Sequence, residues 1–125
     1  MIGLTKTATT TVALDKNTAL AVGSGALPVF GTPMMVALME EAACLCMAEL
    51  YTDKGQTCVG TAISVAHTAP TPVGQQVTAT ATMTGIEGRQ VTFDLTAHDE
   101  KGLIGTGTHT RFMVDEAKFM AKLNP

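Results

Sequence analysis

The sequence predicts an α+β fold in which one long apolar helix lies against a curved antiparallel sheet of about five strands. Three observations lead to this expectation. Residues 34–48 are apolar at every position except two glutamates, which is typical of a buried helix. Residues 77–84 and 91–98 alternate apolar and polar side chains with the two-residue period of a half-buried strand. Short turn sequences separate the strand candidates, which favours antiparallel neighbours.

The first half of the chain leads from a strand to the helix. Residues 5–14 are rich in threonine and form the first strand candidate. Residues 15–30 are small and glycine-containing, and they predict a loop with a short helical turn. Thr32 followed by Pro33 predicts the helix start, because a threonine hydroxyl caps free N–H groups and proline suits the first helical position. The helix is expected to end near Leu50–Tyr51, ahead of a turn-forming TDKG sequence.

The second half predicts four strands, at residues 57–68, 77–84, 91–98 and 103–114, with turns at residues 85–88 and 99–102. On the first strand, the face expected to meet the helix carries Val59, Thr61, Ile63, Val65 and His67. On the next two, the positions expected to point inward are Val77, Ala79, Ala81, Met83, Val91, Phe93, Leu95 and Ala97. A short last helix is expected after Asp115, which is a suitable N-cap.

Composition places residues 1–125 in one domain with an aliphatic core, since 46% of the residues are hydrophobic and only 4% aromatic. A formal net charge of −3 without a Lys/Arg cluster argues against a nucleic-acid partner. No apolar run suits a signal peptide or a membrane span, so a cytoplasmic protein is expected. The three cysteines and three histidines lack metal-ligand spacing, and the cysteines are interpreted as small core residues.

Glu40 and Glu41 interrupt the apolar helix. Adjacent helical residues point about 100° apart, so at least one carboxylate is expected to face packed protein or a cleft. Burying a carboxylate costs several kcal/mol unless it is paired, which makes such a residue a candidate functional group. An internal salt bridge is the structural alternative. The residues alone do not choose between the two glutamates, because both have apolar neighbours on the helix.

Two histidines are candidates for pairing with that carboxylate or supporting it. His67 lies on the strand face expected to meet the helix, where a hydrogen-bonded core histidine is the structural alternative. His109 and Arg111 share one face of the last strand with two glycines, Gly105 and Gly107. Those glycines indicate a close approach of the helix or a ligand to the strand.

Three segments resemble the hot-dog-fold acyl-CoA thioesterases, in particular the fluoroacetyl-CoA thioesterase family. They are VFGTPMMVALMEEA (29–42), GTAISVAHTAPTPVG (60–74) and EGRQVTFDLTAHDEKGLIGTGTHTRF (87–112), in the family's order and spacing. The resemblance implies a hot-dog fold and hydrolysis of an acyl-CoA to free acid and CoA, with CoA as part of the substrate and no separate cofactor. Small residues at 18–29, without a placeable aromatic lid, favour short acyl chains with no selection for a fluorinated one.

Carried over by this resemblance, the family's catalytic triad falls on Thr32, Glu40 and His67, and its backbone-amide glycine falls on Gly60. His67 and Glu40 would activate Thr32 or a water, and N–H groups of Gly60 and the helix start would hold the oxyanion. A capping role for Thr32 is compatible with this, because a cap lies at the positive helix end. Further candidates for substrate or coenzyme contact are Phe30, His109 and Arg111.

The spacing of Gly60 and His67 predicts an oligomer. Seven residues of one strand span about 23 Å, which is too far for one active site. Both residues serve one site only if they come from different subunits, and an unpaired apolar edge strand favours pairing with a second copy. A homodimer, possibly pairing into a tetramer, is therefore expected. A hot-dog enoyl-CoA hydratase or dehydratase and a non-catalytic acyl-CoA-binding protein are the alternative functions.

Overall fold

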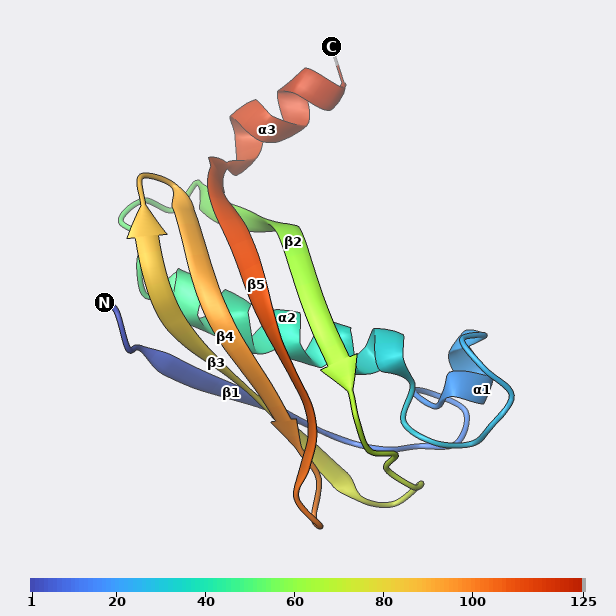
Figure 1. Ribbon diagram of the computed structural model, residues 1–125. Helices are drawn as coiled ribbons and strands as arrows, with labels where there is room; N and C mark the ends of the chain where they lie inside the picture. The colour runs from blue at the N-terminus through green and yellow to red at the C-terminus, as the bar shows by residue number, and fades with distance from the viewer. Residues whose placement is uncertain (125) are drawn as a thin grey trace.

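The computed structural model describes residues 1–124 and has the predicted α+β arrangement. Its elements are β1 (Thr5–Thr11), α1 (Ala19–Val22), α2 (Thr32–Ala48), β2 (Gln56–His67), β3 (Gln76–Glu87), β4 (Gln90–His98), β5 (Leu103–Asp115) and α3 (Glu116–Leu123). The strands form one antiparallel sheet in the order β1-β3-β4-β5-β2. The sheet curls around α2, while α3 projects beyond its end (Figure 1). The predicted sheet of about five strands is confirmed.

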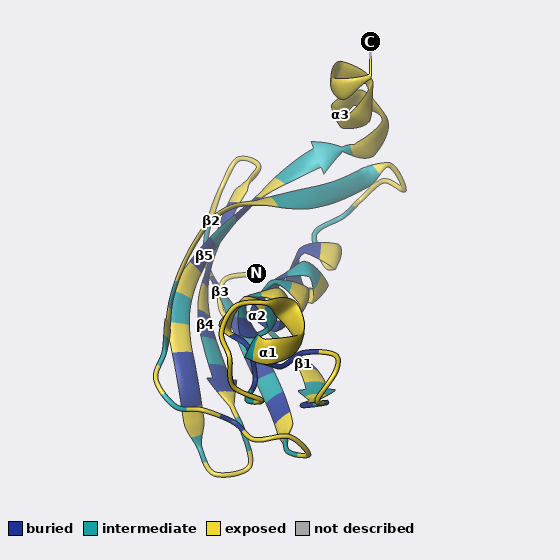
Figure 2. Cartoon of the chain, turned by 90° about the vertical axis from the view of Figure 1, so that its right-hand side faces the viewer, coloured by how far each residue is buried: buried dark blue, intermediate teal, exposed yellow. Residues whose placement is uncertain are grey.

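The core lies between α2 and the concave face of the sheet (Figure 2). All eight inward positions predicted for β3 and β4 are buried, which confirms the alternating pattern. From the helix, the largest fully buried side chains are those of Met35, Met39 and Met47. Methionines and alanines thus fill the space that aromatic side chains occupy in many cores.

The helix start differs from the prediction. Gly31, and not Thr32, is the N-cap of α2, and no side chain caps it; Thr32 is the first helical residue and Pro33 lies in the first turn. The predicted capping role of Thr32 is therefore wrong, and its hydroxyl bonds to His67 instead. The helix is also not buried on all sides, because Glu41 is exposed and Leu45 is 45% exposed.

Strand β2 carries a bulge that changes which residues share a face. Gly60 pairs with Arg111 and Ala62 pairs with Thr110, so Thr61 is an extra residue without a partner on β5. An extra residue shifts the alternation by one position. The prediction that Val59 and Thr61 face the helix together with Ile63, Val65 and His67 is therefore wrong. Before the bulge the helix side carries Cys58 and Gly60, and after it Ile63, Val65 and His67.

Three other boundaries complete the comparison with the sequence. The predicted turn at residues 85–88 is wrong, because β3 continues to Glu87 and the chain turns at Gly88 and Arg89. The first strand ends at Thr11, three residues before the predicted end. The last helix begins as expected, with the Lys118 N–H donating to the Asp115 carboxylate over 3.0 Å.

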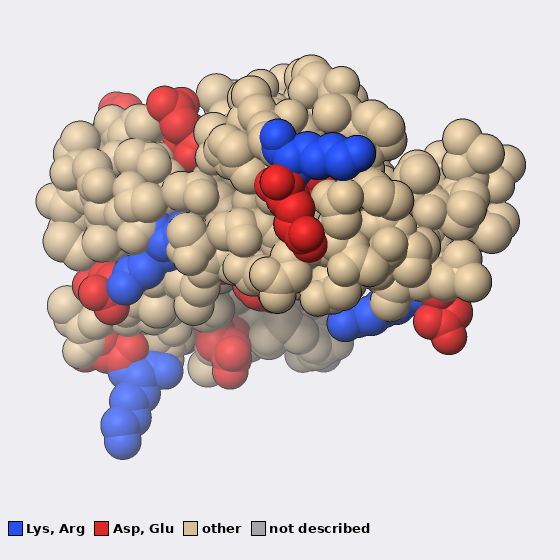
Figure 3. Space-filling model, turned by 90° about the horizontal axis from the view of Figure 1, so that it is seen from below, with Lys and Arg blue, Asp and Glu red and all other residues tan. Residues whose placement is uncertain are grey.

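Charged side chains are dispersed on the surface seen in Figure 3, where basic groups lie among acidic and uncharged ones. One exposed pair joins Lys6 to Glu49 at 3.9 Å. Within residues 1–124, no helix is long and apolar enough to cross a bilayer.

Candidate active site

Thr32 and His67 form a hydrogen-bonded pair where α2 begins and β2 ends. The distance from Thr32 Oγ1 to His67 Nδ1 is 2.7 Å. Burial lowers the pKa of His67, which keeps the imidazole neutral at neutral pH. With its proton on Nε2, His67 accepts the hydroxyl proton of Thr32 at Nδ1. The arrangement matches a nucleophile or water-binding hydroxyl beside a general base.

One nitrogen of the imidazole lacks a well-formed hydrogen bond in the described chain. His67 Nε2 is buried and has no partner of good hydrogen-bond geometry within residues 1–124, although the backbone of Ala69 lies near enough to raise the pKa of His67 against the larger effect of burial. A buried polar atom is normally satisfied, so an unpaired one at this position indicates a missing group. The ring of Phe30 lies edge-on to the imidazole, with the two centroids 6.5 Å apart.

A small cavity lies beside the Thr32–His67 pair. Its volume is about 300 Å³, and short side chains from α1, the loop before α2 and the end of β2 line it, together with Phe30. The volume is at the lower end of the range for small-molecule sites. Phe30 is 2% exposed and is part of the cavity wall.

Glu40 belongs to a second cluster, with Arg111 and His109. Arg111 Nη1 donates to Glu40 Oε2 over 2.9 Å and to His109 Nε2 over 3.2 Å. His109 Nδ1 lies 2.7 Å from the carbonyl oxygen of Ala62, so Nδ1 carries the proton and Nε2 is the acceptor. Burial lowers the pKa of His109, which agrees with this neutral form. Glu40 keeps 38% of its side chain exposed, whereas only 7% of the Arg111 side chain is exposed.

Gly60 provides the space that this cluster needs. A Cβ at Gly60 would lie 2.7 Å from Glu40 Oε2 and 3.2 Å from Arg111 Nη1, closer than real side chains approach. Gly105 on β5 likewise allows close approach, since a Cβ there would lie 2.6 Å from Met35 Sδ. The prediction of a close approach to the helix is confirmed for Gly105, whereas a Cβ at Gly107 would meet Ser64 and Val65 of the neighbouring strand β2.

Within one chain the predicted site residues form two separate groups. Thr32 and Glu40 are eight residues apart on α2, a rise of about 12 Å. Gly60 and His67 lie near opposite ends of β2, as the sequence spacing indicated. The structure thus brings Thr32 to His67 and brings Glu40 to Gly60, but it does not unite the four in one subunit.

Two cysteines beside the Glu40 cluster were not anticipated from the sequence. The expectation of core cysteines holds for Cys46, but Cys44 and Cys58 are only half-buried. Arg111 Nε donates to Cys58 Sγ over 3.2 Å. The signal was present in the spacing: Cys44 follows Glu40 by one helical turn, and Cys58 precedes Gly60 by one strand repeat.

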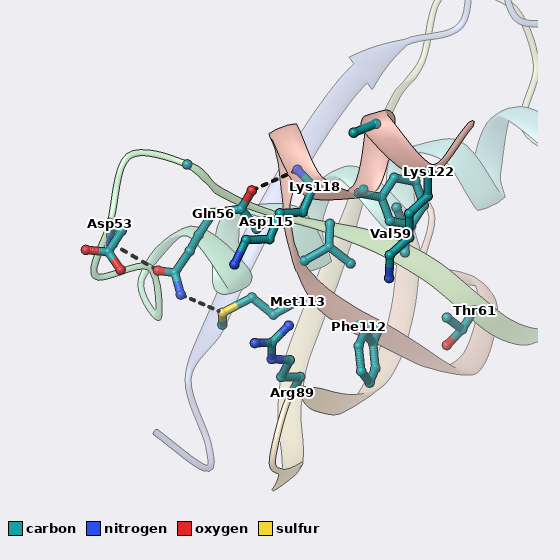
Figure 4. A pocket seen from close by; sticks show the side chains of 14 residues that line it. Asp53, Gln56, Val59, Thr61, Arg89, Phe112, Met113, Asp115, Lys118 and Lys122 are labelled. Carbon is teal, nitrogen blue, oxygen red and sulfur yellow. Dashed lines mark hydrogen bonds between the residues drawn. The ribbon is translucent and has the colours of Figure 1, made fainter. Parts of the chain in front are cut away.

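A groove of about 970 Å³ lies between α3 and the outer face of β2 and β5 (Figure 4). Val59 and Phe112 form its apolar floor, and Arg89, Lys118 and Lys122 border it. None of the predicted site residues lines this groove. The groove lies on the outer face of β2, opposite the helix side that carries Cys58 and Gly60. Among the described residues, no group of three His, Cys, Asp or Glu side chains is placed to hold a metal ion.

Comparison with known proteins agrees with this geometry. The model of the fluoroacetyl-CoA-specific thioesterase family matches residues 14–117. The fluoroacetyl-CoA thioesterase of Streptantibioticus cattleyicolor is 46% identical over 95 residues, covering 76% of this chain and 68% of that protein.

Solved structures extend the likeness to the whole fold. A crystal structure of the fluoroacetyl-CoA thioesterase FlK is 37% identical, with a TM-score of 0.89 over 99% of this chain and 95% of the other. A hot-dog-like protein from Thermanaerovibrio acidaminovorans shares the fold at 24% identity, with a TM-score of 0.86 over 98% of this chain and 89% of that one. The thioesterase interpretation is therefore favoured over the hydratase and the non-catalytic binder. The chain belongs to the fluoroacetyl-CoA-specific thioesterase family, and it is an acyl-CoA thioesterase with a hot-dog fold.

Proposed function

We propose that this protein hydrolyses short-chain acyl-CoA thioesters at a composite site in a homodimer. Thr32 and His67 come from one subunit, and Glu40 and Gly60 come from the other. The observation that carries the proposal is the unpaired, buried Nε2 of His67. Since Glu40 lies about 12 Å from Thr32 along the same helix, a second subunit is the source of a carboxylate for that nitrogen.

The free edge of β2 supports a specific mode of pairing. A two-fold axis that sets two β2 strands antiparallel pairs residues symmetrically about one midpoint. Because Thr61 is an extra residue in the bulge, Gly60 faces His67 of the second subunit when that midpoint lies at Ser64. Residues 60–64 are all exposed in the single chain, and Ile63 keeps 37% of its surface in solvent. Pairing covers this exposed edge.

In the proposed reaction, the oxygen of Thr32, or of a water held by Thr32, attacks the thioester carbonyl carbon. His67 accepts the proton of that oxygen, and the carboxylate of Glu40 stabilises the imidazolium that forms. The negative charge on the carbonyl oxygen is met by N–H groups of Gly60 and of the first turn of α2. The carbon–sulfur bond then breaks, and the CoA thiolate takes the proton from His67. Where Thr32 is the nucleophile, a water that His67 deprotonates then attacks the acyl-Thr32 ester, and the free acid leaves as the Thr32 oxygen takes the proton back. CoA is part of the substrate, and no further cofactor takes part.

Arg111 and His109 have a positioning role in this scheme. Arg111 is 6% exposed and bonds to the Glu40 carboxylate, and His109 in turn accepts a hydrogen bond from Arg111. Their burial disfavours the coenzyme contact considered from the sequence. Holding one carboxylate oxygen leaves the other, Oε1, free to meet the imidazole of the second subunit.

The size of the cavity supports a short acyl group. About 300 Å³ is available beside Thr32, and Phe30 closes one wall. The segment at residues 18–29 places alanine, serine and aliphatic residues near this cavity, and it contains no aromatic side chain. We therefore propose short acyl substrates without special selection for a fluorinated one.

The test is complementation between two inactive variants. Thr32→Ala and Glu40→Gln homodimers are each expected to lose about 10²–10⁴-fold in kcat. If the site is composite, a heterodimer of the two contains one intact site and one doubly mutated site. Subunits mixed equally and re-associated therefore regain about a quarter of the wild-type activity. Sedimentation equilibrium gives the oligomeric state of each sample.

Glu41→Gln is the matched control, since Glu41 is exposed and contacts neither cluster. It is expected to keep wild-type activity. Mixtures that stay as inactive as the parent variants, or a folded and active monomer at micromolar concentration, would show that the site is not shared between subunits.

A further inference from the structure

Two thiols, Cys44 on α2 and Cys58 on β2, lie next to the contact between helix and strand that holds Glu40. Cys44 is one turn from Glu40 on α2, and Cys58 is one strand repeat from Gly60 on β2. Because Glu40 lies against Gly60, the same spacing on both elements sets Cys44 against Cys58. The two thiols also act on each other's acidity, since the neighbouring Cys58 raises the pKa of Cys44 and the neighbouring Cys44 lowers that of Cys58.

Arg111 connects this thiol pair to the carboxylate. Its Nε donates to Cys58 Sγ over 3.2 Å, while its Nη1 donates to Glu40 Oε2 over 2.9 Å. One guanidinium therefore has three acceptors: the Cys58 sulfur, the Glu40 carboxylate and His109 Nε2. A change in the charge or position of the sulfur acts directly on the group that positions Glu40.

The surroundings make the two thiols chemically unequal. Hydrogen bonds from Cys44, Tyr51 and Arg111 lower the pKa of Cys58, with that from Cys44 the largest and burial opposing them. The same contact with Cys58, together with burial, raises the pKa of Cys44. Cys58 is thus the thiolate and nucleophile, and Cys44 remains a thiol. Both are half-buried, beside a carboxylate whose side chain is 38% exposed, so a small solute reaches them.

We propose that Cys58 and Cys44 form a peroxide-sensitive thiol pair whose disulfide inactivates the thioesterase. The Cys58 thiolate attacks one oxygen of hydrogen peroxide, the O–O bond breaks, and the released hydroxide takes a proton to become water. The Cys44 sulfur then attacks the sulfur of the Cys58 sulfenic acid. The S–O bond breaks, and the hydroxyl leaves as water with the Cys44 proton. Two thiols are oxidised by two electrons, and one peroxide is reduced to two waters.

The disulfide removes the charged acceptor from Arg111. A neutral disulfide sulfur binds Nε more weakly than a thiolate does, so one of the three contacts that fix the guanidinium is weakened. Glu40 is then held less firmly, and the rate falls. This inactivation depends on the proposed role of Glu40, whereas formation of the disulfide does not.

The experiment treats the full-length protein with hydrogen peroxide, follows mass and turnover separately, and then adds dithiothreitol. Peptide mapping is expected to show a Cys44–Cys58 crosslink with the loss of two hydrogen masses. Turnover is expected to fall at least about tenfold and to recover on reduction. Cys46→Ala is the matched control, because Cys46 is buried and bonds only to carbonyl oxygens; it should respond as the wild type does.

Cys44→Ser separates the two steps. It should retain activity before oxidation, form no crosslink, and accumulate on Cys58 a sulfenic acid that dimedone labels. Absence of the crosslink in the wild type, labelling of Cys46 instead of Cys58, or a complete crosslink with unchanged turnover would each overturn the proposal. If Glu40→Gln retains full activity while the crosslink still forms, the proposed role of Glu40 has failed and the thiol chemistry stands.

Discussion

Replacement of Gly60 by alanine tests the geometry of the Glu40 cluster most directly. A Cβ at Gly60 would lie 2.7 Å from Glu40 Oε2, where ordinary contacts begin near 3.4 Å. The backbone of Gly60 is not left-handed, so alanine itself fits without strain. The carboxylate must therefore move, and it moves while Arg111 still holds one of its oxygens.

The size of the effect follows from that displacement. Restoring an ordinary contact shifts the carboxylate by about 0.7 Å, and a misplacement of about 1 Å costs on the order of 10²-fold in rate. We expect kcat to fall about 10- to 100-fold, which is about 1.4–2.7 kcal/mol of barrier. Stability should change little, because Gly→Ala restricts the unfolded chain and offsets part of the lost contact.

The assay is the loss of ultraviolet thioester absorbance, with thermal unfolding measured in parallel. Gly55→Ala is the control, since a Cβ there would lie 3.4 Å from the Asp115 carboxylate, an ordinary contact. It should leave both activity and stability near wild type. Wild-type turnover in Gly60→Ala, or an equal loss in Gly55→Ala, would refute the assignment of Glu40 and Gly60 to one catalytic cluster.

Three further predictions follow from the Thr32–His67 pair. Thr32→Ala should lose about 10²-fold or more in kcat, while Thr32→Ser should retain activity. The melting temperature of both variants should stay near wild type, because Thr32 caps no helix. A loss of stability with normal turnover would indicate a structural role. Because the neutral form of His67 is the base, kcat/KM should fall as His67 becomes protonated; burial lowers the pKa of His67 in one chain and the Glu40 carboxylate of the second subunit raises it, so Glu40→Gln should move the midpoint of this fall to lower pH, and an unmoved midpoint would contradict the pairing. Across a series of acyl-CoA substrates, kcat/KM should be highest for short chains, and a steady rise toward long chains would show that the cavity of about 300 Å³ is not the acyl site.

Much of the fold was predictable because simple periodicities govern it. The alternating threonines and apolar residues of β3 and β4 fixed the buried face, and the apolar run in α2 identified the central helix. Gly105 of β5 correctly indicated close packing against the helix. These features depend on residues that are close in the sequence or on one kind of packing contact, so the sequence pattern alone predicts them.

The contacts of the candidate site residues were harder to predict from the sequence, for physical reasons. The local sequence around Thr32 predicted a helix cap, but the hydroxyl of Thr32 bonds to His67 instead. A local propensity does not reveal a partner that is distant in the sequence. The contact of Arg111 with Glu40 joins residues 71 positions apart and has no local signature. The half-buried state of Cys58 likewise depends on Arg111, which lies across the β2–β5 pair.

The bulge at Thr61 determines which residues of β2 share a face. In a regular strand, residues an odd number of positions apart lie on opposite faces, so the seven-residue separation of Gly60 and His67 would exclude a common face. One inserted residue turns that odd separation into an even number of effective steps, and both residues then face the helix. Deleting Thr61 would move His67 and every later inward residue of β2 to the outer face while leaving Gly60 in place. The position of the bulge in β2 therefore decides, as much as the residues themselves, which side chains face the helix.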